Sequence, residues 1–337
     1  MRVGLVGTGF IAGRHLTALA ALPDVEVVAV ADPDLARAQE VAGRHSAQAH
    51  ADGLAMLDQE ELDAVWLCVP PSAHGPLEAA AVEKRLPFFV EKPLGLDLAG
   101  AARTAEAVRA AGLLTCVGYH WRSLSVVQQA VQEVGDAPVQ LLTGHWLDST
   151  PAAPWWSRRA GSGGQLLEQS THLVDLARLL AGEISTVQAL EVTTPRPEWP
   201  DADVPTASAV LLRFASGAVG TVTSSCVLDR RHDVSLQVVT PGRTLALRER
   251  ALSDHELKIA SGDGERVVRT REDPVLTEDR AFVAALREGH DRVPVPYADA
   301  LLTHAAVCAA DRSARSGGVA VDVATELSDA LEEATRG

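Results

Sequence analysis

Lysine is scarce in this chain of 337 residues, which has three lysines (Lys84, Lys92 and Lys258) against 27 arginines. The four cysteines are scattered and form no C-x-x-C pair. That usage excludes a metal or redox site of this spacing and favours reduced, buried thiols in a cytoplasmic protein. Because arginine supplies nearly every cation, a special role is indicated for Lys92, between Glu91 and Pro93.

Long hydrophobic runs and an excess of positive charge are absent too. No stretch has the length or purity of a membrane span. The net charge of −15 opposes nucleic acid and anionic membrane surfaces as partners. The apolar start after Arg2 is soon interrupted by glycines and Thr8, so we expect mature protein there rather than a secretory signal. The length exceeds that of most single hydrophobic cores and favours two domains.

Residues 1–122 alternate short apolar runs with helical patterns. This alternation predicts a doubly wound α/β domain with a parallel sheet and right-handed crossovers. The predicted strands are Val3–Val6, Val25–Ala31, Ala64–Val69, Pro87–Val90 and Leu114–Gly118. The predicted helices are Phe10–Leu22, Leu35–Arg44, Gly75–Lys84 and Leu98–Ala111.

Residues 123–337 show a different texture, with period-2 runs separated by turns at Ser216-Gly217, Pro241-Gly242 and Gly262–Gly264. We expect an α+β domain with a large, mostly antiparallel open sheet. Other predicted elements are the strand Val139–Trp146, the helices Ser123–Glu133, Gln165–Leu180, Glu278–Glu288 and Ala298–Ser316, and an exposed loop at 198–205.

A glycine loop follows the first predicted strand. Gly7 permits a tight turn, Gly9 lets the backbone approach a pyrophosphate, and the small Ala12 keeps the helix close to the sheet. Phe10 and Ile11 open the helix, whose free N–H groups and dipole favour a phosphate. The alternative is a purely structural strand–helix turn.

Asp32 ends the second predicted strand, where a carboxylate can accept hydrogen bonds from both ribose hydroxyls of a dinucleotide. It would repel a 2′-phosphate, and neither Pro33 nor Asp34 supplies a compensating cation. The sequence therefore favours NAD over NADP.

Three further stretches accompany this pattern: VEKPLG at 90–95, VGYHWR at 117–122 and GGQLLEQSTHLVDLARLLAG at 163–182. As a set they resemble the Gfo/Idh/MocA family of NAD(P)-dependent oxidoreductases over most of the chain. The resemblance implies a Rossmann domain, a C-terminal domain with an open, mostly antiparallel sheet, and a sugar, inositol or related polyol as substrate in the cleft between them.

The resemblance also implies roles for single residues. Lys92 matches the family's catalytic lysine, Glu91 is expected near the nicotinamide ribose, and the peptide before Pro93 could be cis. The strand end and loop beside the nicotinamide are matched by Cys68, Val69, Pro70 and His74.

His172 matches the family's catalytic histidine, and Glu168 stands where many members have aspartate. His120 occupies a place where asparagine or glutamine is common. On one continuous helix, Glu168, His172 and Asp175 would share a stripe at i, i+4 and i+7; a solvated helix is the alternative. His172 suits acid/base work near neutral pH, and the compact ammonium of Lys92 suits a reacting oxygen better than an arginine would.

Specificity is expected from the second domain. Trp155 and Trp156 offer flat rings for the C–H face of a sugar, or they anchor the loop. Arg122, Arg158 and Arg159 could hold an acid group, which extends the candidates to sugar acids, or they are surface charges.

Two rival functions use the same motifs. One is an enzyme that retains NAD and cleaves glycosides or epimerises without net redox change, and the other is a non-catalytic, nucleotide-responsive binding protein. No metal site is predicted. An open sheet needs covering, so we expect a homodimer or homotetramer.

Overall fold

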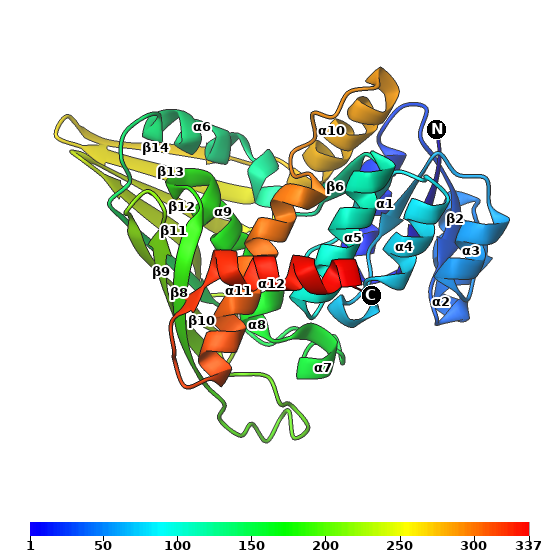
Figure 1. The fold of residues 1–337 in the computed structure, drawn as a ribbon. Coiled ribbons are helices and arrows are strands. Elements are labelled where there is room, and N and C mark those ends of the chain that lie inside the picture. Colours follow the sequence, from blue (N-terminus) through cyan, green and yellow to red (C-terminus); the bar gives the residue numbers. More distant parts are fainter. Residues whose placement is uncertain (337) are drawn as a thin grey trace. The chain divides into compact units, whose positions relative to one another are not determined.

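The structure is a computed structural model that describes residues 1–336. The chain forms two compact units (Figure 1). The first comprises Met1–Gly95, Ala99–His120 and Pro274–Leu301, and the second comprises the remaining described residues. The expected division after residue 122 thus lies close to the observed one, but the segment Pro274–Leu301, assigned by sequence to the second domain, belongs to the first unit.

The first unit contains the predicted parallel sheet. Its strand order is β3-β2-β1-β4-β5-β6, which places a topological switch point between β1 and β4. The strands are β1 (Arg2–Val6), β2 (Glu26–Ala31), β3 (Gln48–His50), β4 (Ala64–Leu67), β5 (Phe88–Val90) and β6 (Thr115–Val117). The helices are α1 (Phe10–Ala20), α2 (Leu35–His45), α3 (Gly53–Gln59), α4 (Pro76–Glu83), α5 (Leu98–Ala111) and α10 (Pro274–Glu288). Strand β3 and helix α3 were not predicted.

The buried strands form the core of this unit, which explains why α10 joins it. Leu5, Val30 and Phe89 are fully buried, as continuous apolar runs predict for a sheet covered on both faces. Phe282 of α10 packs edge-on against Trp66, with ring centroids 5.4 Å apart. A contact between residues so distant in the chain carries no local sequence signal.

The second unit contains a nine-stranded sheet of order β14-β13-β12-β11-β7-β10-β9-β8-β15. All neighbouring strands are antiparallel except β7 and β10, which confirms the predicted, mostly antiparallel sheet. The strands are β7 (Leu141–Leu147), β8 (Ile184–Val192), β9 (Ala207–Phe214), β10 (Val219–Ser225), β11 (Asp233–Thr240), β12 (Arg243–Ala251), β13 (Asp254–Ser261), β14 (Gly264–Thr270) and β15 (Val321–Asp322). All three predicted turns join neighbouring strands.

Helices α6 (Ser125–Val134), α8 (Gln165–Glu168), α9 (Thr171–Ala181) and α12 (Val323–Arg336) lie against one face of this sheet (Figure 1). Helix α7 (Arg159–Ser162) packs against α8, and Ser313 of α11 (Tyr297–Arg315) accepts a hydrogen bond from the N–H group of Ala189 in β8. Leu142 and Trp146 of β7 are buried on the face where Leu173 of α9 packs. The other face carries exposed apolar side chains, among them Leu211 and Leu141.

The predicted helix Gln165–Leu180 is wrong in one respect, because it is two helices, α8 and α9. The N–H group of Ser170 donates to the carbonyl oxygen of Gln165 over 2.9 Å, a wide turn that interrupts regular α-helical bonding. Glu168 and His172 therefore do not lie on one continuous helix, and the predicted i, i+4 stripe does not hold.

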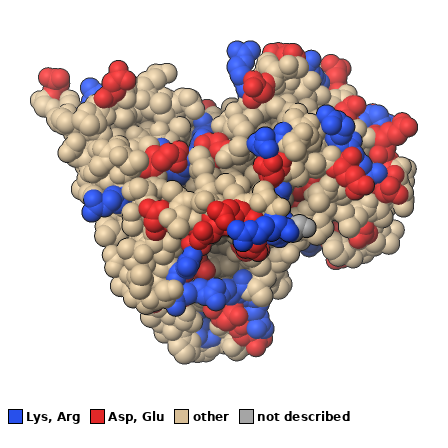
Figure 2. Space-filling model, viewed as in Figure 1, with Lys and Arg blue, Asp and Glu red and all other residues tan. Residues whose placement is uncertain are grey.

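The loop at 198–205 is only partly exposed, since Val204 and Pro205 are buried. Among the described residues, no helix has the length and apolar character needed to cross a membrane. On the face shown in Figure 2, acidic and basic side chains are interspersed.

Candidate active site

The candidate residues fall into two groups, one in each unit. The first unit holds the glycine loop, Asp32 and Lys92, and the second holds Glu168 and His172. Each group has its own supporting contacts.

The glycine loop has the geometry that a phosphate site needs. Gly7 has a φ of +92°, and a Cβ atom there would lie 2.2 Å from the carbonyl oxygen of Cys68, so only glycine fits. Gly9 precedes α1, and a Cβ atom on it would meet nothing within 4 Å. Phe10, the first residue of α1, is 74% exposed. The helix N-terminus therefore lies open to an anionic group such as a pyrophosphate.

Asp32 lies beside this loop as a buried, ionised carboxylate. Its oxygens accept hydrogen bonds from the N–H and hydroxyl groups of Thr8, at 2.9 and 2.6 Å, and from the N–H group of Asp34 at 2.9 Å. Burial opposes ionisation, but these bonds outweigh it and lower the pKa of Asp32 below its usual value. An ionised acceptor at this place suits ribose hydroxyls.

Arg37 is a neighbour of Asp32 that sequence reasoning missed. Its Nε donates to the hydroxyl oxygen of Thr8 over 3.1 Å, and its Nη2 lies 3.7 Å from Asp32 Oδ2. Asp34 caps α2 by accepting the N–H of Arg37, which turns the helix so that this side chain reaches back. The prediction of coenzyme preference looked for a cation only at positions 33 and 34. Recognising Asp34 as a helix cap would have extended that search to Arg37.

The loop after β4 holds His74, which was predicted to lie beside the nicotinamide. His74 Nδ1 lies 2.5 Å from Glu78 Oε1, and the N–H of Gly75 donates to the other oxygen of Glu78 over 2.6 Å. Burial acts to raise the pKa of Glu78. The interaction with His74 and the backbone hydrogen bonds outweigh burial, so this pKa lies below its usual value. Cys68 is buried, and burial raises the pKa of its thiol, so it is neutral. Glu78 thus fixes the ring of His74.

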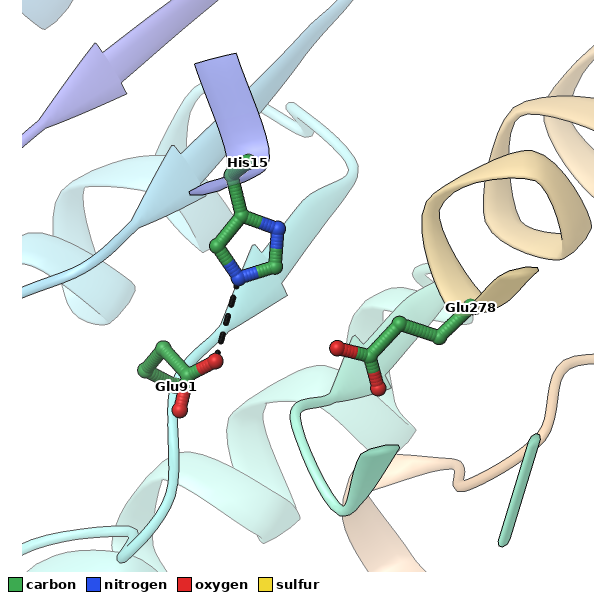
Figure 3. Close-up of side chains that lie close together, drawn as sticks. All are labelled: His15, Glu91 and Glu278. Atoms are coloured by element: carbon green, nitrogen blue, oxygen red, sulfur yellow. Dashed lines mark hydrogen bonds and ion pairs between the residues drawn. The ribbon is translucent and has the colours of Figure 1, made fainter. Parts of the chain in front are cut away.

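Lys92 lies two residues after the end of β5, and the Lys92–Pro93 peptide is cis, as the resemblance allowed. Its N–H donates to Oε2 of Glu91 over 3.2 Å, and Oε1 of Glu91 lies 3.0 Å from Nε2 of His15 (Figure 3). A Cβ atom on Gly118 would come within 2.5 Å of Glu91 Oε1, so a glycine leaves room for the carboxylate. Glu91 is 3% exposed and bonded within its own unit, which does not favour the predicted contact with the ribose.

One group among the described residues has the spacing of a possible metal site. It comprises His15, Glu91 and Glu278, whose ligand atoms lie within 4.8 Å of one another (Figure 3). Asp279, the next residue on α10, binds the other nitrogen of His15. None of His15, Glu278 and Asp279 was predicted, because two elements far apart in the chain bring them together.

In the second unit, aromatic residues support both catalytic candidates. His172 is buried and stacks on Trp146 of β7, with ring centroids 5.9 Å apart and an interplanar angle of 17°. Glu168 Oε2 accepts a hydrogen bond from Trp156 Nε1 over 2.6 Å. Trp156 is 1% exposed and packs in a small core with Val204, which favours the alternative in which this ring anchors the loop. Trp155 is partly buried, and its predicted contact with a sugar ring stays a prediction.

Arg122 and Asp175 form a bidentate pair. Arg122 Nε and Nη2 donate to the two oxygens of Asp175 over 2.7 and 2.6 Å, and Thr303 donates to the same carboxylate. Burial raises the pKa of Asp175, and the charge of Arg122 opposes that rise. The engaged guanidinium does not favour the predicted contact with a substrate.

His120 is buried at the end of the first unit, where its predicted contact with substrate stays a prediction.

The two remaining candidate arginines are also paired with carboxylates. Arg158 lies 3.2 Å from Asp201 at an exposed site. Arg159 binds Asp311 and Glu191 over 2.6 and 2.7 Å. These contacts favour the surface and structural interpretations over the binding of a substrate acid group.

Comparison with known proteins gives two matching family descriptions. Residues 1–119 match the GFO_IDH_MocA description, an oxidoreductase family with an NAD-binding Rossmann fold, and residues 127–244 match the GFO/IDH/MocA C-terminal domain. The two matches follow one another in the order of the two domains.

Individual relatives cover much of the chain. It is 30% identical over 252 residues to an inositol 2-dehydrogenase of Acidothermus cellulolyticus, covering 73% of this chain and 72% of that protein. It is 27% identical over 307 residues to an inositol 2-dehydrogenase of Rhizobium meliloti, covering 87% and 91%. A solved structure of levoglucosan dehydrogenase in complex with NADH has the same fold, with a TM-score of 0.85 at 22% identity over 96% of this chain and 99% of that one.

Proposed function

Because the chain belongs to the Gfo/Idh/MocA family of NAD-dependent oxidoreductases, we propose that it oxidises a secondary hydroxyl group of a sugar, inositol or related polyol. It is an NAD-dependent dehydrogenase of CH–OH groups. The observation that carries the proposal is the open helix N-terminus after Gly9 beside an ionised Asp32. This arrangement fits a dinucleotide whose adenosine ribose has no 2′-phosphate.

The proposed chemistry divides between cofactor and protein. Bound NAD supplies the hydride acceptor. His172 removes the hydroxyl proton as general base, and its ring is held by the stack on Trp146. Lys92 donates a hydrogen bond to the same oxygen and stabilises negative charge there. Both residues are inferred from their match to the family's motifs.

Glu168 has one of two roles in this proposal. Its carboxylate, oriented by Trp156, either supports His172 or binds a hydroxyl group next to the reacting one. The first role acts mainly on kcat, whereas the second acts mainly on KM. Glutamate extends the carboxylate by one methylene compared with the commoner aspartate, so the preferred substrate need not be the same as in relatives with aspartate.

The proposed substrates are neutral polyols. Relatives named inositol 2-dehydrogenase and levoglucosan dehydrogenase support this class. The pairing of Arg122, Arg158 and Arg159 with carboxylates leaves these arginines engaged, so sugar acids are disfavoured.

A substrate panel tests the proposal. Neutral inositols, anhydrosugars and sugars are incubated with the enzyme and NAD, and NADH is followed by absorbance. We expect NADH with at least one neutral polyol and a weaker response with the matching sugar acid. Product without NADH would instead indicate an enzyme that retains its cofactor and has no net redox turnover, and NADP-only activity would contradict the coenzyme assignment.

We also propose that the open sheet face joins copies of the chain into a dimer or tetramer. Leu211 is 50% exposed, Leu190 61% and Val219 42%, and all three lie on neighbouring strands. Exposed apolar side chains on a sheet favour an interface. Sedimentation of the Leu211→Arg variant should show smaller species than the parent, and an unchanged assembly would contradict this proposal.

The four cysteines support a cytoplasmic location, which we propose on that ground. All four are free thiols, and Cys68, Cys116 and Cys226 are buried. Free thiols persist in reducing compartments. Export of the full-length protein in a fractionation experiment would contradict the assignment.

A further inference from the structure

His15 lies at the centre of a buried polar cluster that joins α1, α10, β4 and the residue after β5 in the first unit. Its side chain is on α1 and is fully buried. Nδ1 lies 2.9 and 3.0 Å from the two oxygens of Asp279 on α10, and Nε2 lies 3.0 Å from Glu91 Oε1 after β5. Trp66 of β4 donates to Asp279 over 2.9 Å, and Glu278 turns its carboxylate toward the same space (Figure 3).

Both ring nitrogens of His15 face carboxylates. A neutral imidazole has one N–H and can donate only once, whereas an imidazolium donates from both nitrogens. Burial alone would lower the pKa of His15, but the charges and hydrogen bonds of Asp279 and Glu91 raise it well above its usual value. The hydrogen-bond geometry and the direction of this shift both favour a protonated His15 ring.

A proton and a metal ion exclude each other at His15 Nε2. A metal ligand must offer a lone pair, which a protonated nitrogen lacks. The distance of 3.0 Å from Nε2 to Glu91 is an ordinary hydrogen-bond length, and Asp279 already uses the other nitrogen. The geometry favours the proton.

We propose that His15 is a positioning residue that, through Glu91, holds the backbone of Lys92 in register with the nucleotide-binding turn at the start of α1. The connection is short, because one oxygen of Glu91 binds His15 and the other accepts the N–H of Lys92. Asp279 holds the far side of the ring, and Gly118 leaves the space that the Glu91 carboxylate occupies. The inference rests on the proposed function, since it concerns the reaction in which Lys92 takes part.

This arrangement predicts a split between kinetic parameters. His15 is fully buried and lies five residues after Phe10, more than one helical turn from the start of α1, so removing its charge leaves the helix N-terminus in place. The turn carrying Lys92, in contrast, loses a fixed support, and small displacements of a catalytic group cost up to about 10²-fold in rate. Turnover should fall while NAD affinity is kept.

The test compares His15→Gln with His45→Gln, a control on α2 where the histidine contacts none of the cluster. For His15→Gln we expect kcat on the responding polyol to fall at least about tenfold and Kd for NAD to change less than about threefold. The control should change neither. In the unmodified enzyme, the imidazole ¹⁵N resonances that His15→Gln removes should be those of an imidazolium at pH 7.

A second variant covers the case in which His15→Gln does not fold. Asp279→Asn keeps the side-chain volume but removes the negative charge that Asp279 places beside His15. This variant should lower both kcat and the pH at which the His15 signals titrate. An unchanged kcat in the folded His15 variant, neutral-imidazole signals at pH 7, or one equivalent of tightly held metal in the purified enzyme would each overturn the inference. If the unmodified enzyme turns over no polyol, the proposed function fails and the positioning role with it, while the resonances still decide the charge of His15.

Discussion

The indole N–H of Trp156 donates a hydrogen bond to Glu168 Oε2 over 2.6 Å, and it joins the loop before α7 to a carboxylate four residues before His172. The ring is fully buried, so it acts on the site through this bond rather than by stacking on a substrate. Of the two interpretations of Trp156, contact with a sugar ring or anchoring of the loop, these contacts favour the second, with the ring also orienting Glu168.

Replacing Trp156 by phenylalanine should therefore impair the enzyme without unfolding it. The ring still fills most of its space beside Val204, but the loss of one hydrogen bond to a charged group costs about 1.5–3 kcal/mol locally. We expect kcat/KM to fall about tenfold. A loss in kcat assigns Glu168 to the support of His172, and a rise in KM assigns it to substrate binding. Trp199→Phe, a partly buried tryptophan of the neighbouring loop, is the control, and equal effects in both variants would refute the role of this bond.

The pair between Arg122 and Asp175 should dominate local stability in the second unit. Asp175 is 1% exposed, and removing one partner of a buried pair leaves an uncompensated charge, at a cost of about 3–5 kcal/mol. Asp175→Ala should therefore lower the free energy of unfolding by roughly that amount in urea titrations. The exposed Asp201, paired with Arg158, offers the matched control, and its alanine variant should change stability by less than about 1 kcal/mol. Similar losses in the two variants would contradict the structural assignment of Asp175.

The cluster around His15 makes stability depend on pH with a defined sign. The folded-state pKa of His15 is raised because Asp279 and Glu91 outweigh burial, and Glu278 faces the same space. Its contribution is fully present below the unfolded pKa of about 6.5 and is lost as the pH rises through the folded pKa. The melting temperature should fall as the pH rises above neutrality through the folded-state pKa, and it should fall less in His15→Gln.

His45 gives a contrast of opposite sign for this scan. Burial lowers its pKa, and the charge of Arg44 lowers it further, so protonation of His45 disfavours the fold at low pH. His45→Gln should therefore leave the alkaline slope unchanged. An alkaline slope that is the same in His15→Gln and in the unmodified protein would show that His15 is not the group that titrates.

Coenzyme choice should depend on the pair Asp32 and Arg37. Asp32 is ionised and repels a 2′-phosphate, while the guanidinium of Arg37, half exposed, lies 3.7 Å from it. Asp32→Ser should weaken NAD binding at least about tenfold and narrow the preference over NADP. Adding Arg37→Ala should then weaken NADP more than NAD. Titration of both nucleotides into each variant measures the ratios, and tighter NADP than NAD in the unmodified enzyme would contradict the assignment.

Local signals predicted much of the first unit. The glycine loop, Asp32 and the apolar strands are set by neighbours in sequence, and they lie where the sequence placed them. The unpredicted helices α3 and α12 also carried a local signal, since Asp52 and Asp322 cap them by accepting N–H groups of Ala55 and Thr325.

Other features depend on contacts between distant residues and had no local signal. Asp279 reaches His15 across 264 positions, so neither the placement of α10 nor the buried cluster around His15 could be derived from a pattern. The break after Glu168 depends on a single wide turn at Ser170, within a stretch whose period is helical throughout. Arg122 was predicted to bind substrate because the spacing of motifs in the sequence does not reveal its bidentate partner Asp175, 53 positions away.

The central claim is that Lys92 and His172 carry out proton chemistry during oxidation of a polyol by NAD. The most direct test is a single-turnover experiment in which enzyme preloaded with NAD is mixed with the best substrate of the panel and NADH absorbance is recorded. Lys92→Ala and His172→Ala should each bind NAD normally and form NADH at least about 10²-fold more slowly. Lys84→Ala, an exposed lysine paired with Asp58, should match the unmodified enzyme. Unchanged NADH formation in Lys92→Ala or in His172→Ala would contradict the account.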